Sequence, residues 1–510
     1  MSATNNNKRI AKNTVFLGIR MVLVLLITLY TTRVVLSALG VADYGVYTVV
    51  AGFVTMCAFI STSMANGIQR FFNFELGKSG VEGAVQVFNT GLLIQVIFAA
   101  VIILFTELVG IWYVNHKMVI PPDRLYAAQW LLQFSILNLT LSMIQVPFKA
   151  SVMAHEKMNY YAIVSITDAL LKLGIAFAIK YSPIDRLIYY GALMSVIHFI
   201  NICLYTIYSK IHFEEIRFKK GFNKSLFKSM LVFSGWNLFG TLSRTMRNQG
   251  LGMVLNLFFG PVVNAAQGIA NQVSNGFHNL VVNLSTASRP QIVQSYSQGN
   301  LERSIRLMMS VSKLTTLLLY VVAYPIMIEI DYVLRIWLGD NIPDGTRYLV
   351  IIVVITMFVS NLQSFISSIV HATGKMKTYQ LTCSIINILI VPAAYFACKI
   401  GANVESVFII GFIIEVMVFI ASVLILKHLI RFSVREYIKK VITPIVIVML
   451  ITIIIPLVPH FFMPIGFVRF AIVSIIAVLT SSICSYYLGI SNQEKEIVRS
   501  FLRIKKNHKV

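Results

Sequence analysis

The chain of 510 residues is 57% hydrophobic and 12% charged, with 43 Lys and Arg residues against 20 Asp and Glu residues and a net charge of +23. Soluble globular proteins carry about one quarter charged residues, so this composition excludes an ordinary soluble protein. The basic residues lie between apolar runs rather than in one patch, which argues against nucleic-acid binding and indicates loops that determine membrane topology.

Apolar runs of about 18 to 25 residues recur along the chain, and each is long enough to cross a hydrocarbon core ~30 Å thick. They predict an all-α polytopic membrane protein with about fourteen transmembrane helices. The stretch 262–284 is rich in Asn and Gln and is predicted by spacing as much as by composition. The helices are expected, in chain order, near 14–36, 46–68, 85–113, 125–147, 160–180, 187–208, 229–257, 262–284, 310–337, 348–370, 379–398, 405–427, 441–458 and 467–488.

The predicted helices group into two six-helix bundles followed by a C-terminal helix pair. The expected segments are an N-terminal bundle (1–208), a basic cytoplasmic linker (209–228), a C-terminal bundle (229–430), and two additional transmembrane helices with a basic cytoplasmic tail (431–510). All other connections are short, so no soluble catalytic domain fits between the helices. The five cysteines are scattered and include no CxxC pair, which gives neither a disulfide framework nor a zinc site.

Basic residues predict the orientation of the chain. If the N-terminus is cytoplasmic, the loops and tails on that side contain 29 Lys or Arg residues, and the opposite loops contain 6. Cytoplasmic loops carry the excess of basic residues in membrane proteins. We therefore expect both termini in the cytoplasm.

A weak internal repeat has a period of about 220 residues. Leu39-Gly40 opens one predicted helix, and Phe259-Gly260 opens another in the equivalent place. Six helices in each half is an even number, so both halves enter the membrane from the same side and form a parallel repeat. Such halves pack around a central cavity whose opening alternates between the two sides, which is the geometry of a transporter.

Four cations inside predicted helices are candidate substrate-binding residues. Arg244 and Arg247 lie near the middle of the seventh helix, share a face at i and i+3, and have no acidic residue within a turn. Paired guanidinium groups suit a phosphate or pyrophosphate, whereas snorkelling or pairing with an acid on another helix is the alternative. Lys172 pairs with Asp168 at i, i+4 or binds an anion in a cavity. Arg20 either snorkels to the headgroups or forms the inner rim of that cavity.

Intramembrane acids are costly, so each is a functional candidate. Asp168 in the fifth helix, Glu329 and Asp331 in the ninth and Glu415 in the twelfth could each bind a coupling ion or pair with a basic residue. Among the other polar residues in helices, His198 and Asn201 are interpreted as interhelical hydrogen-bonding residues, Lys313 as snorkelling, and Arg33 and Arg469 as interfacial anchors.

The stretch from Arg33 to Tyr47, with Leu39-Gly40 at its centre, resembles the end of the first helix in polysaccharide flippases of the Wzx type. Phe259-Gly260-Pro261 through Ala270 resembles its second-half counterpart, and the helix count, short loops and orientation are similar over the whole chain. That family belongs to the multidrug/oligosaccharidyl-lipid/polysaccharide exporter superfamily. Many relatives carry an acid in the middle of the seventh helix, where this chain has Arg247-Asn248-Gln249, so a cation-coupling site there is not carried over.

The resemblance implies a flippase that moves a polyprenyl-pyrophosphate-linked oligosaccharide from the inner to the outer leaflet of the bacterial cytoplasmic membrane. Its product would enter a cell-surface polysaccharide such as lipopolysaccharide. The implied partners are the lipid-linked glycan, the bilayer and polysaccharide-assembly enzymes, without nucleic acid. No catalytic residue, metal ligand or cofactor is expected. The chain has no GxxxxGK[ST] loop, so proton or sodium coupling, membrane potential or product removal would drive transport.

Two alternatives remain. A cation-coupled multidrug or metabolite exporter of the same superfamily would need an apolar cavity with an acidic centre, against which the two central arginines argue. A membrane glycosyltransferase or polysaccharide polymerase would need a large outer loop, which the predicted topology lacks. A scaffold without transport is disfavoured by the costly intramembrane charges.

Overall fold

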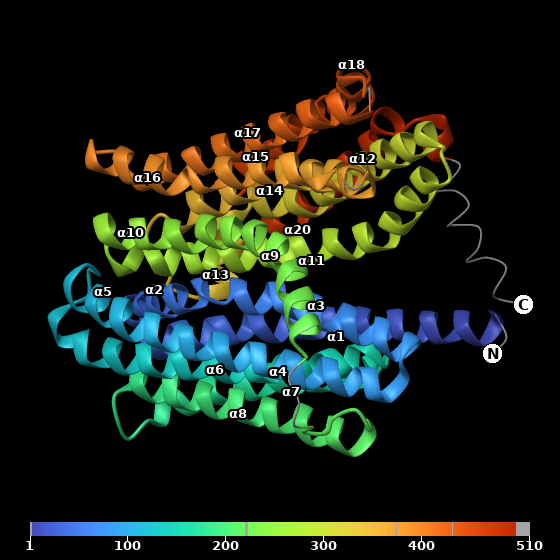
Figure 1. The fold of residues 1–510 in the computed structure, drawn as a ribbon. Helices are drawn as coiled ribbons and strands as arrows, with labels where there is room; N and C mark the ends of the chain where they lie inside the picture. Colours follow the sequence, from blue (N-terminus) through green and yellow to red (C-terminus); the bar gives the residue numbers. More distant parts are fainter. Residues whose placement is uncertain (1–2, 220–222, 374, 431, 496–510) are drawn as a thin grey trace, which may run out of the picture. The chain divides into compact units, whose positions relative to one another are not determined.

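A computed structural model describes residues 3–219, 223–373, 375–430 and 432–495, and all regular structure in these ranges is helical (Figure 1). Within these ranges, side chains are described at all positions except 3–19, 66, 236, 237 and 280–290. Part of the predicted linker (220–222) and most of the predicted tail (496–510) therefore lie outside the described residues.

Eleven helical segments in the described ranges are long and apolar enough to cross a membrane, or twelve if α2 and α3, bent by 51° at their junction, form one span. The predicted all-α polytopic fold is confirmed, and the predicted number of fourteen is approximate. The predicted spans 229–257 and 262–284 are helical but are not among these apolar segments. Arg, Asn and Gln residues lower the hydropathy of these two segments. The helices form nevertheless, because an unpaired backbone polar group is not tolerated in lipid.

The chain divides into two compact units. Unit 1 comprises Met1–Gly268, Trp337–Asp344 and Val391–Val404, and unit 2 comprises Ile269–Ile336, Gly345–Ile390 and Glu405–Val510. Each is described by itself below.

In unit 1, α6 packs along α8, α1 along α7, and α3 against α4, α6 and α9. Aromatic residues fill the interior between α3, α4, α6 and α8, among them the fully buried Phe72 and Phe88, with the Phe88 and Phe148 rings 5.2 Å apart. The unit contains α1 (Ala3–Leu39), α2 (Val41–Met56), α3 (Phe59–Lys78), α4 (Gly80–Phe105), η1 (Thr106–Gly110), α5 (Ile111–His116), η2 (Pro122–Arg124), α6 (Leu125–Ala154), α7 (Met158–Ala178), η3 (Ile179–Tyr181), α8 (Arg186–His212), α9 (Lys224–Thr245), η4 (Met246–Gly250), α10 (Leu251–Phe259), the start of α11 (Pro261–Ser297) and most of α16 (Ile390–Lys399).

In unit 2, α12 packs against α14, α19 and α20. Its core includes Tyr320 and Tyr324, whose hydroxyl groups bond to Thr452 Oγ1 (2.7 Å) and to the Thr452 carbonyl (3.0 Å). These bonds satisfy buried hydroxyl groups and hold α19 on α12. The unit contains the remainder of α11, α12 (Leu301–Ile328), most of α13 (Ile330–Leu338), α14 (Thr346–Thr373), α15 (Met376–Ile388), α17 (Val404–Ile430), α18 (Val434–Tyr437), η5 (Ile438–Ile442), α19 (Thr443–Phe462), α20 (Phe467–Cys484) and η6 (Ser485–Gly489).

The proposed repeat is visible in the backbone of two glycines. Gly40 precedes α2 with φ 82° and ψ 168°, and Gly260 precedes α11 with φ 79° and ψ −174°. Only glycine adopts this conformation readily, so the same sharp junction recurs at the two positions that the sequence comparison aligned. Just after the first junction, a Cβ at Gly45 would lie 1.8 Å from the carbonyl oxygen of Pro261, so α2 and α11 approach with backbone in contact.

The acid in the first repeat motif has a structural role that the sequence did not reveal. Arg124 Nε donates to Asp43 Oδ1 (2.6 Å), and Arg124 Nη1 donates to Asp185 Oδ2 (2.5 Å). Asp185 is also the N-cap of α8, accepting from the N–H groups of Leu187 and Ile188. One guanidinium group thus joins the ends of α2, α6 and α8 on the side predicted to be external.

Candidate substrate-binding site

The predicted arginine pair lies where the seventh membrane helix departs from α-helical geometry. α9 ends at Thr245, the π-helical turn η4 covers Met246–Gly250, and α10 continues to Phe259. Arg244 lies in the last turn of α9, and Arg247 lies within η4. A π-helical turn inserts one residue into a helix and is frequent at functional sites, because it redirects the side chains around it.

Amide side chains of α11 satisfy backbone carbonyls around this turn. Gln267 Nε2 donates to the carbonyl of Asn248 (3.3 Å), and Asn264 Nδ2 donates to the carbonyl of Gly252 (2.8 Å). Asn264 is fully buried. On the α2 side, a Cβ at Gly52 would lie 2.8 Å from Gln249 Oε1. The Asn and Gln residues that made 262–284 a weak span by hydropathy therefore support the irregular turn.

The region is cationic over a long stretch of sequence. Residues 216–301, which include all of α9, η4, α10 and α11, contain no Asp or Glu. Arg244 is exposed and Arg247 is partly buried, and the two charges are close enough to interact. Arg247 makes a further contact. A pair of guanidinium groups in this setting can bind a phosphate or pyrophosphate with directed hydrogen bonds.

The other intramembrane pair of unit 1 is neutralised. Lys172 Nζ donates to Asp168 Oδ2 (2.8 Å), and Asn201 Nδ2 donates to Asp168 Oδ1 (2.7 Å). Ser142 Oγ and His198 Nδ1 are 3.3 Å apart. One oxygen of Asp168 therefore accepts a bond from within α7, and the other links α7 to α8. Asn201 and His198 make the interhelical hydrogen bonds expected of them.

Arg20 lies elsewhere in unit 1, on α1. Its Cζ is 4.6 Å from the centre of the Tyr161 ring, and Lys149 Nζ is 5.2 Å from the same ring centre. All four cations predicted as substrate ligands belong to unit 1, on α1, α7, α9 and η4.

The remaining predicted acids belong to unit 2, and two of them are engaged with basic residues. Glu329 is fully buried between Arg469 Nη2 (2.8 Å) and His460 Nδ1 (2.7 Å). Asp331 is half-exposed and pairs with Arg347 Nη1 (2.7 Å). The ninth helix does not run unbroken to 337 as expected: α12 ends at Ile328 and α13 begins at Ile330. The contacts of Glu329 and Asp331 with basic residues favour the ion-pair interpretation of these two acids. Glu415 is buried within α17 and has a partner.

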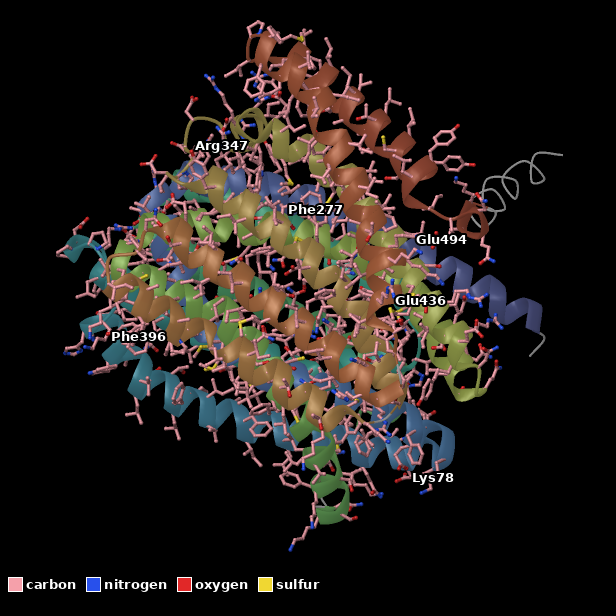
Figure 2. The ribbon with its side chains drawn as sticks, turned by 90° about the horizontal axis from the view of Figure 1, so that it is seen from above. Lys78, Phe277, Arg347, Phe396, Glu436 and Glu494 are labelled. Atoms are coloured by element: carbon pink, nitrogen blue, oxygen red, sulfur yellow. The ribbon has the colours of Figure 1, made fainter. Side chains whose placement is uncertain are left out.

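Two interpretations of basic residues in unit 2 need correction. Arg469 is buried against Glu329 rather than anchored at the interface, and Lys313 is buried rather than snorkelling. Lys313 Nζ lies 2.7 Å from Glu494 Oε2. Glu494 lies near the end of the described chain (Figure 2). The partners lie 140 and 181 positions away in sequence, so only the folded arrangement reveals these pairs.

No family model matches the chain, and no curated protein matches it. Solved structures do. The lipid II flippase MurJ in an inward closed conformation has a TM-score of 0.67 at 13% identity, covering 93% of this chain and 98% of that one. An inward-facing multidrug resistance MATE family transporter of the MOP superfamily has a TM-score of 0.66 at 13% identity, covering 80% of this chain and 96% of that one.

A MOP superfamily transporter from Pyrococcus furiosus, described as having a binding pocket of reverse polarity, has a TM-score of 0.61 at 15% identity and covers 82% of this chain and 95% of that one. The chain therefore shares its fold with these solved structures, two of which are described as MOP superfamily transporters. The resemblance to Wzx-type flippases fits at this level.

Proposed function

Starting from the MOP fold, we propose that the protein is a flippase for a polyprenyl-pyrophosphate-linked oligosaccharide, carrying it from the inner to the outer leaflet of the bacterial cytoplasmic membrane by alternating access. Both termini would face the cytoplasm, and the translocated glycan would pass to polysaccharide-assembly enzymes. Proton or sodium coupling, the membrane potential or removal of the product would drive transport. This assignment makes the protein a transporter and not an enzyme.

The cationic centre of the seventh helix carries the proposal. Arg244 and Arg247 flank or occupy a π-helical turn in a stretch of 86 positions, 216–301, without an acidic residue. A pyrophosphate loses its hydration on entering a membrane, and guanidinium groups replace that hydration with charge-assisted hydrogen bonds. A cavity for cationic drugs would instead require acidic residues. Lys172 and Arg20 are the further cations that we assign to the substrate path.

One structural neighbour, the lipid II flippase, supports a lipid-linked substrate. The lipid II flippase covers 93% of this chain, and the MATE transporter covers 80%. For another neighbour, the reverse polarity of its binding pocket is described as suggesting a different function. The alternative, a cation-coupled drug or metabolite exporter, has no such support from the charges of the seventh helix.

A transport assay in proteoliposomes tests the proposal. A fluorescent polyprenyl-diphosphate sugar is placed in the vesicles, and its exposure on the outer leaflet is followed by an impermeant quencher, with a lipophilic cation as the competing substrate. We expect movement of the diphosphate lipid only. Arg244→Ala and Arg247→Ala should each reduce its rate at least tenfold, and lysine at either position should restore part of it. Transport of the cation, or full activity of both variants, would contradict the proposal.

A further inference from the structure

Two cations from different helices converge on one aromatic ring in unit 1. Arg20 comes from α1, Lys149 from α6 and Tyr161 from α7, with the guanidinium carbon 4.6 Å and the ammonium nitrogen 5.2 Å from the ring centre. α6 ends and α7 begins on the side predicted to be cytoplasmic, so this cluster lies towards that membrane face. Stacking on the ring attracts each cation but leaves its positive charge uncompensated.

The nearest intramembrane acid of α7 does not supply that compensation. Asp168 lies seven positions beyond Tyr161, about 10 Å along the helix axis. Its two oxygens already accept hydrogen bonds from Lys172 and Asn201. Among the described residues, no ion pair includes Arg20 or Lys149. Two like charges around one ring therefore repel each other until an anion joins them.

Arg20 also has a donor to satisfy. Its Nε is buried and has no hydrogen-bond acceptor among the described residues. A buried donor without an acceptor is costly, and a guanidinium group presents its donors in a fixed fork that matches the oxygens of a phosphate. Lys149 is exposed, so a ligand can approach from the membrane surface.

The Tyr161 ring is held in place through the contacts of the preceding residue, Tyr160. Tyr160 donates its hydroxyl hydrogen to the carbonyl of Leu204 (2.8 Å) and stacks on Tyr208, with ring centres 3.6 Å apart. These contacts fix the first turns of α7 on α8. The position of Tyr161 is therefore set by the fold before any ligand binds.

We propose that Arg20, Lys149 and Tyr161 form a binding site for the phosphate group of an anionic lipid at the inner membrane face. The forked guanidinium group would bind two phosphate oxygens, and the ammonium group would supply the second charge. Both a bulk phospholipid with net negative charge and a polyprenyl diphosphate carry this chemistry. With a polyprenyl diphosphate as the ligand, the site rests on the proposed function, because Arg20 also belongs to the substrate path assigned above. With a bulk phospholipid as the ligand, it is independent of that function.

Native mass spectrometry of the purified full-length protein tests the site. The probes are phosphatidylglycerol, farnesyl diphosphate, and phosphatidylcholine as a lipid without net charge. Arg20→Gln and Lys149→Gln should each weaken binding of an anionic probe about tenfold, the loss expected for one charged hydrogen bond. The double variant should lose less than the product of the two effects, because both residues hold one ligand. Loss for one probe only identifies that lipid as the source of the phosphate.

Matched controls are available at other cation–aromatic contacts. Arg70 Cζ lies 4.2 Å from the centre of the Phe233 ring, and Lys210 Nζ lies 5.5 Å from the centre of the Phe218 ring. Among the described residues, neither ring has a second cation against it. Arg70→Gln and Lys210→Gln should leave binding within twofold of wild type. If Arg20→Gln fails to fold, Lys149→Gln at its exposed position decides the result. Unchanged binding of both anionic probes by the folded variants, or equal losses in the controls, would overturn the proposal.

Discussion

The cluster of Glu329, Arg469 and His460 makes a quantitative prediction about how the last two helices are attached. Glu329 is fully buried, and Arg469 is 8% exposed in its side chain. Glu329→Gln leaves the guanidinium charge buried without its carboxylate. Breaking a buried ion pair from one side costs about 3–5 kcal/mol. The shift in melting temperature per kcal/mol falls with chain length and is about 1–2 °C for a chain of this size, so the melting temperature should fall by roughly 3–10 °C.

An exposed pair in the same unit is the control. Asp331 and Arg347 are 52% and 49% exposed, so Asp331→Asn should cost about 0–1 kcal/mol. Thermal unfolding in detergent, followed by the monomer peak in size-exclusion chromatography, measures both variants. Replacing Glu329 and Arg469 together by Leu should recover most of the loss, since no buried charge then remains unpaired. If Glu329→Gln is as stable as Asp331→Asn, the buried pair does not hold these helices.

Three further predictions follow from unit 1. Gly45→Ala forces a Cβ against the first backbone carbonyl of α11 and should lower the melting temperature by several degrees. Gly77 in α3 has open space around it, so Gly77→Ala should be neutral or should stabilise the protein by up to ~1 kcal/mol in the same thermal assay. Asp185 has a lowered pKa: burial opposes ionisation, but hydrogen bonds from the Arg124 guanidinium and two backbone amides outweigh it. The ionised Asp185 carboxylate stabilises the folded state fully above the unfolded pKa of about 3.9, and this stabilisation is lost as the pH falls through the lower folded pKa. The difference in melting temperature between wild type and Asp185→Asn should therefore be constant from about pH 5 to 8 and shrink below about pH 4. Asp168→Asn leaves the Lys172 charge unpaired and should reduce the amount of folded protein, as quantified by immunoblot. The double variant with Lys172→Met should restore that amount. Folding of the single variant at wild-type levels would contradict the pairing.

The membrane fold could be predicted from the sequence because its cause is local. Each apolar run must become a helix to satisfy its own backbone in lipid, and the even spacing of basic loops reports the alternation of spans. The Leu39-Gly40 and Phe259-Gly260 motifs were sufficient to align the halves, since each glycine adopts a positive φ at the sharp junction between two helices.

The partners of polar residues could not be predicted in the same way. Asp43 and Arg124 are 81 positions apart and Glu329 and Arg469 are 140 apart, so no spacing rule connects them. The pair Asp168 and Lys172 was readable because i, i+4 residues on a helix are neighbours. The π-helical turn beside Arg244 could not be predicted from the sequence, because its inserted residue depends on hydrogen bonds from side chains of α11.

The most direct test of the proposed substrate is the identity of the lipid that co-purifies with the protein. Protein extracted from its native membrane with native lipids retained would be analysed by mass spectrometry, alongside the Arg244→Ala and Arg247→Ala double variant. We predict a polyprenyl-diphosphate-linked glycan bound to the wild type and depleted in the variant. Only bulk phospholipid, or the same glycan at equal occupancy in both proteins, would contradict the assignment of the arginine pair as the pyrophosphate site.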